Sequence, residues 1–475
     1  MSTSRDNYAT IVREREVVRA LMPAQEHKLP LSNLDWLLPP VDVSVFLCYY
    51  NPNNTWNENF NPAVPMVIST LKKALANTLV YYYAFAGELS RNPAGELELL
   101  CNNQGVDFIQ AYADVQLKEL NLHKPDVSVE GKIVPKRKQG VLCIQVTELQ
   151  CGGLVIGCTF DHRIADAFSA NMFLLAWAEI ARGQPVSRLP TFDRSLLHPR
   201  QFGHYNKSID GMYKPLSAPP TRGPNDHHPI SRIYYIDADT INRIHSLANT
   251  ANSMNGNMQK SKLESFTAFL WQVFSRNSNT EKAKRIKMGV VVDGRTRLAK
   301  NYGEQEQVFE KHRHVHPICN YVGNVLSIPF GDLSISDVMK KPLSSVADEV
   351  QEFLSSALTK EHFMGLIDWV EVHRPKPTLA RIYCTSSEEE VAIVVSSGLR
   401  FPVRRVDFGW GRPAFGSYHF SWESSAGYVM PMPSPSGNGD WIVYMHGTKE
   451  HLEYLEEEVC DVFKPMSSHY LNLDI

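Results

Sequence analysis

The chain has 475 residues, of which 43% are hydrophobic and 21% charged, and its formal net charge is −3. A chain of this length exceeds one ordinary hydrophobic core, so we expect two domains of roughly 200 residues each. The small net charge gives no sign of binding to nucleic acid or to a membrane surface, so an anionic ligand would need local basic groups.

The termini and the cysteines favour a cytoplasmic protein. The N-terminal segment lacks the long apolar stretch of a signal peptide, and no run approaches the roughly 18 apolar residues that predict a membrane span. The 8 cysteines are scattered and form no CxxC pair. This pattern is typical of buried free thiols in a reducing compartment rather than of a disulfide framework.

Strands and helices alternate irregularly along the first part of the chain. An amphipathic helix is predicted over 65–87, ending at Gly87, and a second helix over 165–183, with Gly183 as its stop. Two strands within 141–162 are joined through Gly152 and Gly153. Further strands are predicted within 9–21, 43–50, 95–101 and 105–114.

A proline-rich stretch with little periodicity separates the two parts of the chain. After it come predicted strands in 232–237 and 285–298 and helices in 261–276 and 451–463. We therefore expect an N-terminal domain over 1–184, a crossover linker over 185–229 and a C-terminal domain over 230–475. The irregular alternation favours an α+β fold over a doubly wound parallel sheet.

The stretch GCTFDHRIAD places His162 at the end of an apolar strand and Asp166 in the first turn of the next helix. Loops at strand ends are frequent positions for catalytic groups, and a histidine can accept and return a proton at neutral pH. Both residues also have ordinary structural explanations, a partly buried histidine and a carboxylate favoured by the helix dipole. The HxxxD spacing alone is therefore a weak signal.

A second stretch, VDFGWGRP, has little chance of regular secondary structure. Its glycines, Gly409 and Gly411, permit positive φ and close backbone approach, and Trp410 between them offers a large flat surface. The alternative is a glycine-rich turn that packs an aromatic ring into the core. No G-x-S-x-G, GxGxxG or P-loop is present, which argues against serine hydrolysis, nucleotide redox chemistry and phosphoryl transfer.

Other polar clusters are better explained as solvated surface. The alternating histidines His312, His314 and His316 have the spacing of metal ligands on a strand, but they lie in a charged segment without a fourth ligand nearby. The basic residues of PKRKQG and EKAKRIK are also assigned to the surface. We therefore predict no metal site.

Taken together, DHRIAD followed later by DFGWG resembles the plant BAHD acyl-CoA-dependent acyltransferases. The segments LSNLDWLLP, VVDGRTRL and NYVGNV are also similar to the family, whereas the usual Tyr-Pro and Gly-Arg after the Leu-rich helix are here Tyr-Ala and Gly-Glu. Within the family, LCNNQGVDF, GCTFDHR, LIDWVEVHRP and GDWIVYMH look most like coniferyl alcohol acyltransferases.

The resemblance implies two similar chloramphenicol-acetyltransferase-like domains joined by a long crossover loop, with a solvent channel between them. His162 would act as the general base on an acceptor hydroxyl, which attacks the thioester carbonyl of an acyl-CoA. Asp166 would pair with Arg295 and support the histidine loop. Asp407, Gly409, Trp410 and Gly411 would shape the channel wall rather than take part in the chemistry.

For the co-substrate, acetyl-CoA or hydroxycinnamoyl-CoA, the resemblance points to Ser261 and Lys262 at the start of a helix and to Ser396 and Ser397 near the pantetheine arm. A helix N-terminus beside a lysine is a sensible phosphate site. No tightly bound cofactor is implied. The partners expected are small molecules only, without nucleic acid or a membrane span, and relatives lead us to expect a monomer.

The acceptor positions depart from the shikimate-using relatives. Those enzymes have a tryptophan near Gly398 and a His-Thr pair near Asp42 and Val43, both of which are missing here. A small residue at Gly398 would leave room for a flat acceptor such as a phenylpropenyl alcohol. Transfer of an acetyl group to coniferyl alcohol is thus the first hypothesis, and hydroxycinnamoyl transfer to shikimate, quinate or another alcohol or amine is the second. A silent binding protein and a thioesterase or esterase are the alternatives from other classes.

Overall fold

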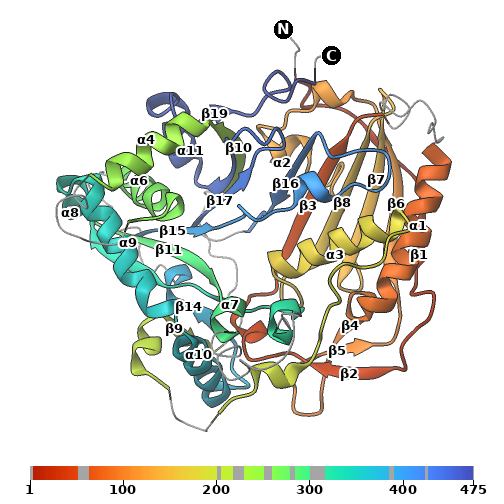
Figure 1. The fold of residues 1–475 in the computed structure, drawn as a ribbon, viewed down its shortest axis with the longest axis horizontal. Coiled ribbons are helices and arrows are strands. Elements are labelled where there is room, and N and C mark those ends of the chain that lie inside the picture. Colours follow the sequence, from red (N-terminus) through yellow and green to blue (C-terminus); the bar gives the residue numbers. More distant parts are fainter. Residues whose placement is uncertain are drawn as a thin grey trace, which may run out of the picture.

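The computed structural model describes residues 4–51, 64–200, 205–217, 229–250, 259–278, 284–299, 316–384, 390–422 and 426–473. Its strands form two large mixed sheets, the first mainly from the N-terminal part of the chain and the second from the C-terminal part (Figure 1). Helices α1 and α3 lie beside the first sheet, and α4, α6, α8 and α9 lie beside the second. In the described part of the chain, every helix is too short or too polar to traverse a bilayer.

The first sheet has six strands, and its pairs are antiparallel except for β6 and β7. In spatial order the strands are β1 (Thr10–Val18), β6 (Val106–Ala113), β7 (Leu142–Leu149), β8 (Leu154–Asp161), β3 (Asp42–Tyr49) and β16 (Phe415–His419). A small sheet beside it contains β2 (His27–Pro30), β5 (Leu97–Cys101) and β4 (Glu88–Arg91).

The second sheet mixes parallel and antiparallel pairs, and β15 runs parallel to both of its neighbours. In order its strands are β12 (Leu326–Ser327), β11 (Arg285–Asp293), β15 (Glu390–Ser396), β17 (Gly427–Pro433), β18 (Trp441–Gly447), β10 (Ile230–Ile236) and β19 (Lys464–Pro465), with β13 (Phe330–Ser334) also on β11. Both sheets are mixed rather than doubly wound, which confirms the α+β prediction.

The described helices are mostly amphipathic and cover the sheets from outside. They are α1 (Val64–Tyr81), α2 (Pro125–Ser128), α3 (Ala167–Ala181), α4 (Ala238–Ala248), α6 (Lys262–Asn277), α7 (Arg295–Leu298), α8 (Ile335–Lys340), α9 (Leu343–Ala357), α10 (Lys360–His373) and α11 (Lys449–Glu458). Gly183 ends α3 as predicted. It adopts φ +69°, its amide donates to the Ile180 carbonyl, and the next amide donates to Glu179, a Schellman arrangement.

Three predicted boundaries were wrong. The helix expected to reach Gly87 ends at Tyr81, because the Tyr82 ring turns into the core against Phe85 and Phe173, and a 3₁₀ turn follows. The strand expected over 285–298 stops at Asp293, where a glycine introduces helix α7. The helix expected over 451–463 is α11, which begins at Lys449 and ends at Glu458, before the Val459 C-cap.

The proline-rich linker contains regular structure that its composition did not predict. Its described part includes 3₁₀ turns at Arg194–Leu197 and Lys207–Gly211. It also includes strand β9 (Tyr213–Pro215), which pairs with β14 (Thr378–Ala380) of the second part of the chain. The crossover is therefore packed along the C-terminal half over this stretch.

Strand β16 comes from the second part of the chain but completes the first sheet. Phe415 pairs with Cys48, and His419 pairs with Ser44 on β3. The core of the first sheet accordingly includes buried side chains from beyond residue 400, among them Phe401, Phe408 and Trp410. The domain limits at 184 and 230 stay a prediction. Strand β16 lies in the predicted C-terminal domain but pairs with β3 of the predicted N-terminal domain.

Candidate active site

His162 lies directly after β8, at the edge where β3 begins. Its backbone amide donates to the Val41 carbonyl at 2.9 Å, which extends the β3–β8 pairing past the register of Asp42 with Asp161. The fully buried Asp161 accepts hydrogen bonds from Arg137 at 3.0 Å and from Arg163 at 2.7 Å. These bonds hold the end of the strand, and with it the position of His162, in place.

The imidazole of His162 is half-buried and is not committed to a protein partner. Nδ1 has no hydrogen-bond partner of normal geometry among the described residues, and the ring stands edge-on to Phe420, with centroids 6.4 Å apart. Burial lowers the pKa of His162 below its usual value, and its own carbonyl and the carboxylates of Asp166 and Asp161 only oppose this shift. The ring is therefore neutral at pH 7 and able to accept a proton.

Asp166 is the N-cap of α3 and pairs with Arg295. Its Oδ1 accepts from the Ser169 amide and hydroxyl, both at 2.9 Å. Arg295 donates to both carboxylate oxygens, at 2.7 and 3.1 Å, and the Val325 amide donates to Oδ2 at 3.2 Å. Because both oxygens are occupied by donors other than His162, the pair is not a His–Asp couple of the serine-protease kind.

Arg295 is buried at 1% exposure and joins the two halves of the molecule. Besides Asp166, its guanidinium donates to the carbonyls of Tyr321 and Gly323, both at 3.0 Å. The planar face lies 4.3 Å from the centre of the Phe168 ring. Such a fully satisfied guanidinium is costly to disturb, because removing one partner leaves a buried charge uncompensated.

A second support of the histidine loop was not assigned from the sequence. The buried Asn324 side chain donates to the His162 carbonyl at 2.8 Å and to Asp35 at 2.9 Å, and Asp35 also accepts from the Asn324 amide at 2.8 Å. The other Asp35 oxygen accepts from Ser32. The segments LSNLDW and NYVGNV carried these residues, but nothing in the sequence shows that they meet.

The DFGWG segment forms a closed loop. The Asp407 carboxylate accepts from the amides of Gly409 at 2.8 Å and Gly411 at 3.0 Å, and both glycines have positive φ, 115° and 116°. The Trp410 ring is stacked with Phe408 and packs edge-on to Tyr49 of β3, with centroids 6.1 Å apart. The loop therefore closes on itself and buries a tryptophan in the first core.

The two motifs lie at opposite ends of α3. Asp166 caps the start of the helix, and the Arg182 side chain at its end donates to the Asp407 carbonyl. A helix of 15 residues is about 22 Å long at about 1.5 Å per residue. Trp410 therefore lies too far from His162 to touch a reaction there, which agrees with the structural role expected for DFGWG.

The residues expected to contact coenzyme A lie on two separate elements. Ser261 is the exposed N-cap of α6, and it forms a reciprocal capping box with Glu264, whose carboxylate accepts from the Ser261 amide. Lys262 beside it is exposed. Ser396 ends β15 and hydrogen-bonds to the Tyr428 hydroxyl, and Ser397 is exposed.

The acceptor positions do not provide the room that the sequence suggested. Asp42 is bound by Arg137 at 2.7 Å, and Val43 is buried. A Cβ at Gly398 would lie 2.6 Å from Met432 Cγ and 3.0 Å from Met430 Cγ. The space beside Gly398 is thus filled by methionines, and the argument for an open pocket at this position was wrong.

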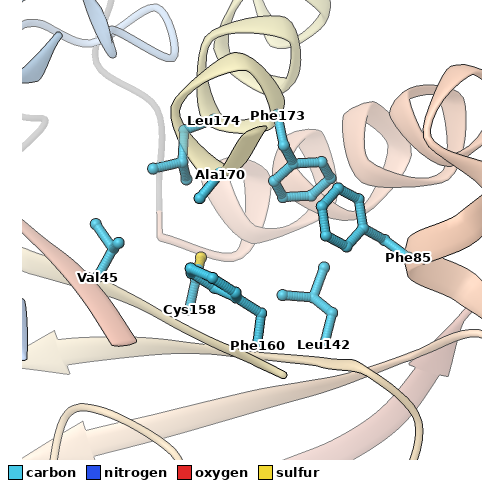
Figure 2. A pocket seen from close by; sticks show the side chains of 8 residues that line it. All are labelled: Val45, Phe85, Leu142, Cys158, Phe160, Ala170, Phe173 and Leu174. Carbon is cyan, nitrogen blue, oxygen red and sulfur yellow. The ribbon is translucent and has the colours of Figure 1, made fainter. Parts of the chain in front are cut away.

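Beneath the strand that leads to His162 lies a small apolar cavity of about 10 Å³ (Figure 2). It is enclosed by α3 and the first sheet, and its lining consists of Val45, Phe85, Leu142, Cys158, Phe160, Ala170, Phe173 and Leu174. A space of this size and character is a packing gap rather than a substrate site.

One polar cluster has the ligand types of a metal site. Asp126, Glu130 and His419 bring their ligand atoms within 4.8 Å of one another. Each has a protein partner instead: the Ser231 amide donates to Asp126, and His419 Nε2 lies 3.3 Å from the Glu130 carboxylate. Of the alternating histidines, His312 and His314 lie outside the described residues, and His316 caps the 3₁₀ turn at Pro317–Asn320.

The chain is similar to known proteins over most of its length. The model of the Transferase family matches residues 10–462. The chain is 26% identical over 461 residues to the hydroxycinnamoyltransferase of Narcissus pseudonarcissus, covering 93% of this chain and 97% of that one. It is also 26% identical over 474 residues to the shikimate O-hydroxycinnamoyltransferase of Nicotiana tabacum, covering 95% and 99%. This chain belongs to the BAHD family of acyltransferases.

Solved structures support the fold of this BAHD enzyme. The crystal structure of vinorine synthase superposes with a TM-score of 0.71 at 19% identity, over 97% of this chain and 100% of that one. F. sporotrichioides TRI101, complexed with coenzyme A and T-2, gives a TM-score of 0.70 at 14% identity, over 92% and 99%. The two-domain acyltransferase fold and an acyl-CoA co-substrate, as predicted, follow from these findings and the family.

Proposed function

We propose that this enzyme transfers an acetyl group from acetyl-CoA to the hydroxyl of a phenylpropanoid alcohol such as coniferyl alcohol. The observation that carries the proposal is the state of His162, whose ring is neutral and half-buried on a loop held by residues from both halves of the chain. Among the described residues no hydrogen bond of normal geometry occupies either ring nitrogen, of which Nδ1 is the buried one. A channel between the halves would admit acyl-CoA from one side and the alcohol from the other.

In the proposed reaction, His162 accepts the hydroxyl proton while the alcohol oxygen bonds to the thioester carbonyl carbon. The tetrahedral intermediate then collapses, the C–S bond breaks, and the thiolate of coenzyme A takes the proton back from His162. Asn324 and the Asp166–Arg295 pair hold the loop on which the base sits, through the His162 carbonyl and the start of α3. Proton transfer of this kind typically contributes about 10²–10⁴-fold in rate.

The acetyl donor and the coniferyl-type acceptor rest on the motif resemblance, particularly GCTFDHR, LIDWVEVHRP and GDWIVYMH. The second candidate is hydroxycinnamoyl transfer to shikimate, quinate or another alcohol or amine. It is favoured by the names of the relatives, which include a fatty alcohol:caffeoyl-CoA acyltransferase of Arabidopsis thaliana, 26% identical over 429 residues. No acceptor argument rests on Gly398, since methionines fill that space.

The deciding experiment mixes purified protein with coniferyl alcohol or shikimate, each with acetyl-CoA or p-coumaroyl-CoA, and identifies the products by mass spectrometry. Acetylated coniferyl alcohol as the dominant product supports the first candidate, and coumaroyl shikimate supports the second. Release of coenzyme A at the same rate without any acceptor indicates a thioesterase and would overturn both. The His162→Ala protein serves as the control for uncatalysed transfer.

A further inference from the structure

A row of aromatic rings leads away from His162. Phe420, whose ring faces the imidazole, contacts Tyr428 at 5.0 Å and Trp422 at 5.8 Å between centroids. Trp422 in turn stands edge-on to Tyr383 at 4.5 Å. The rings come from three segments: the residues just after β16, strand β17 and the 3₁₀ turn at Arg381–Tyr383. None of them was singled out by the sequence motifs.

The outer three rings are only half-buried, unlike Phe420, which is 7% exposed. Burial nevertheless raises the pKa of Tyr428 to about 12 and also raises the pKa of Tyr383. These three rings therefore keep some accessible surface, and Phe420 connects their cluster to His162; we call the three rings the aromatic wall.

Hydrogen bonds from behind hold this wall in place. The Tyr444 hydroxyl accepts from the Phe420 amide at 3.0 Å and donates to its carbonyl at 2.9 Å. His446 Nε2 lies 2.7 Å from the Trp422 carbonyl, which can only accept, so this nitrogen carries the proton and Nδ1 accepts from Ser231. Burial lowers the pKa of His446, which keeps this neutral form. The wall is thus preorganised.

We propose that Trp422, Tyr428 and Tyr383 form the binding surface for a planar aromatic ring of one of the two substrates, beside His162. Aromatic rings attract one another in offset and edge-on arrangements, and an indole is the largest flat surface a side chain offers. The ring belongs either to the acceptor alcohol or to the acyl group of the donor. The inference rests on the proposed acyl transfer and names the substrate class for it.

The test compares Trp422→Ala with Tyr112→Ala. Tyr112 is also half-buried, but it lies on β6 beneath the Arg13 guanidinium, away from the site. Steady-state kinetics use three pairs: acetyl-CoA with coniferyl alcohol, acetyl-CoA with 1-hexanol, and p-coumaroyl-CoA with 1-hexanol. We expect Trp422→Ala to raise KM about tenfold for the substrate that bears the ring, with kcat nearly unchanged. The pair without a ring and the Tyr112→Ala enzyme stay at wild-type values.

The pair that responds identifies the source of the ring, coniferyl alcohol for an acceptor site and p-coumaroyl-CoA for a donor site. The proposal is overturned if Trp422→Ala changes KM equally for all three substrate pairs, or if it changes KM for none of them. Where Trp422→Ala does not fold, as judged by its melting temperature, Tyr428→Leu and Trp422→Leu replace it with the same expected result.

A binding measurement separates this inference from the proposed function. Titration calorimetry with coniferyl alcohol and with p-coumaroyl-CoA uses the His162→Ala protein and its double variant with Trp422→Ala. We expect the double variant to bind the responding compound about tenfold more weakly. A wild-type enzyme that transfers nothing refutes the acyl-transfer proposal, whereas equal binding by both variants refutes the aromatic surface.

Discussion

The HxxxD and DFGWG segments are equally conspicuous in the sequence, yet the structure gives them opposite characters. The first contains an uncommitted imidazole, held by partners from both halves of the chain. In the second, the hydrogen bonds are made within the loop, because Asp407 accepts from the Gly409 and Gly411 amides, and Trp410 is buried at 5% exposure. Helix α3 connects the two ends. A motif can therefore be diagnostic of a family because it catalyses or because it folds, and only the contacts distinguish the two.

The largest effect is expected at His162. The His162→Ala enzyme should lose about 10²–10⁴-fold in kcat, the usual contribution of a general base, because the substitution removes the proposed proton acceptor. Its melting temperature should match that of the wild type, since the ring nitrogens support no other residue. Kinetics and thermal unfolding on the same preparation check this. Activity within tenfold of wild type would remove His162 from its role.

The Asp166→Asn variant should act on stability rather than on chemistry. It leaves the buried Arg295 charge with only the more exposed carboxylate of Asp293, at 3.3 Å, which costs up to about 3–5 kcal/mol of unfolding free energy. Activity should fall with the folded fraction, and denaturant unfolding measures both together. If activity disappears while the melting temperature and the His162 loop remain unchanged, Asp166 takes part in the reaction. Its assignment to a purely structural role is then wrong.

A smaller loss is expected from Asp407→Ala. Two loop amides lose their acceptor, at a cost of about 0.5–1.5 kcal/mol each because water can reach them, and kcat per folded molecule should stay at the wild-type value. Chemical denaturation combined with kinetics at a permissive temperature tests this. A large fall in kcat without destabilisation would show that the DFGWG loop takes part in the reaction. This result would contradict the separation of the two motifs by the length of α3.

The smallest effect concerns pH. Because burial lowers the pKa of His162, the neutral base persists below the ordinary value of about 6.5. The logarithm of kcat/KM should therefore be level through neutral pH and decline only on the acid side, with an apparent pKa under 6.5. Profiles of the Asp407→Ala enzyme should show the same inflection. An inflection above 6.5 would mean that the imidazolium is stabilised.

Protein stability should also decline in acid, for a related reason. His362 is buried and His451 half-buried, both beside serine hydroxyls, and desolvation lowers the pKa of each to about 4. Between about pH 6.5 and pH 4 the unfolded chain binds protons that the folded chain does not, so stability falls by up to about 1.4 kcal/mol per pH unit for each. Urea unfolding at several pH values, with His362→Gln as comparison, measures this slope.

Sequence reasoning was strongest where the information is local. The strand before His162, the turn at Gly152 and the stop at Gly183 all follow from nearby residues. It could not find the pairing of Asp35 with Asn324, because these residues are 289 positions apart and neither of their segments indicates its partner in space. Arg295 was matched to Asp166 through family resemblance alone. The prediction of open space beside Gly398 failed because the free volume next to a glycine depends on which residues pack against it. Here two methionines of β17 fill that space.

The placement of β16 bears on how the chain folds during synthesis. Until residue 419 has left the ribosome, the first sheet lacks its last strand, and β3 exposes an unpaired edge with an apolar sequence. Such an edge is a template for pairing with other chains. The N-terminal half expressed alone should therefore aggregate, and the two halves should be recovered in soluble form only when they are produced together.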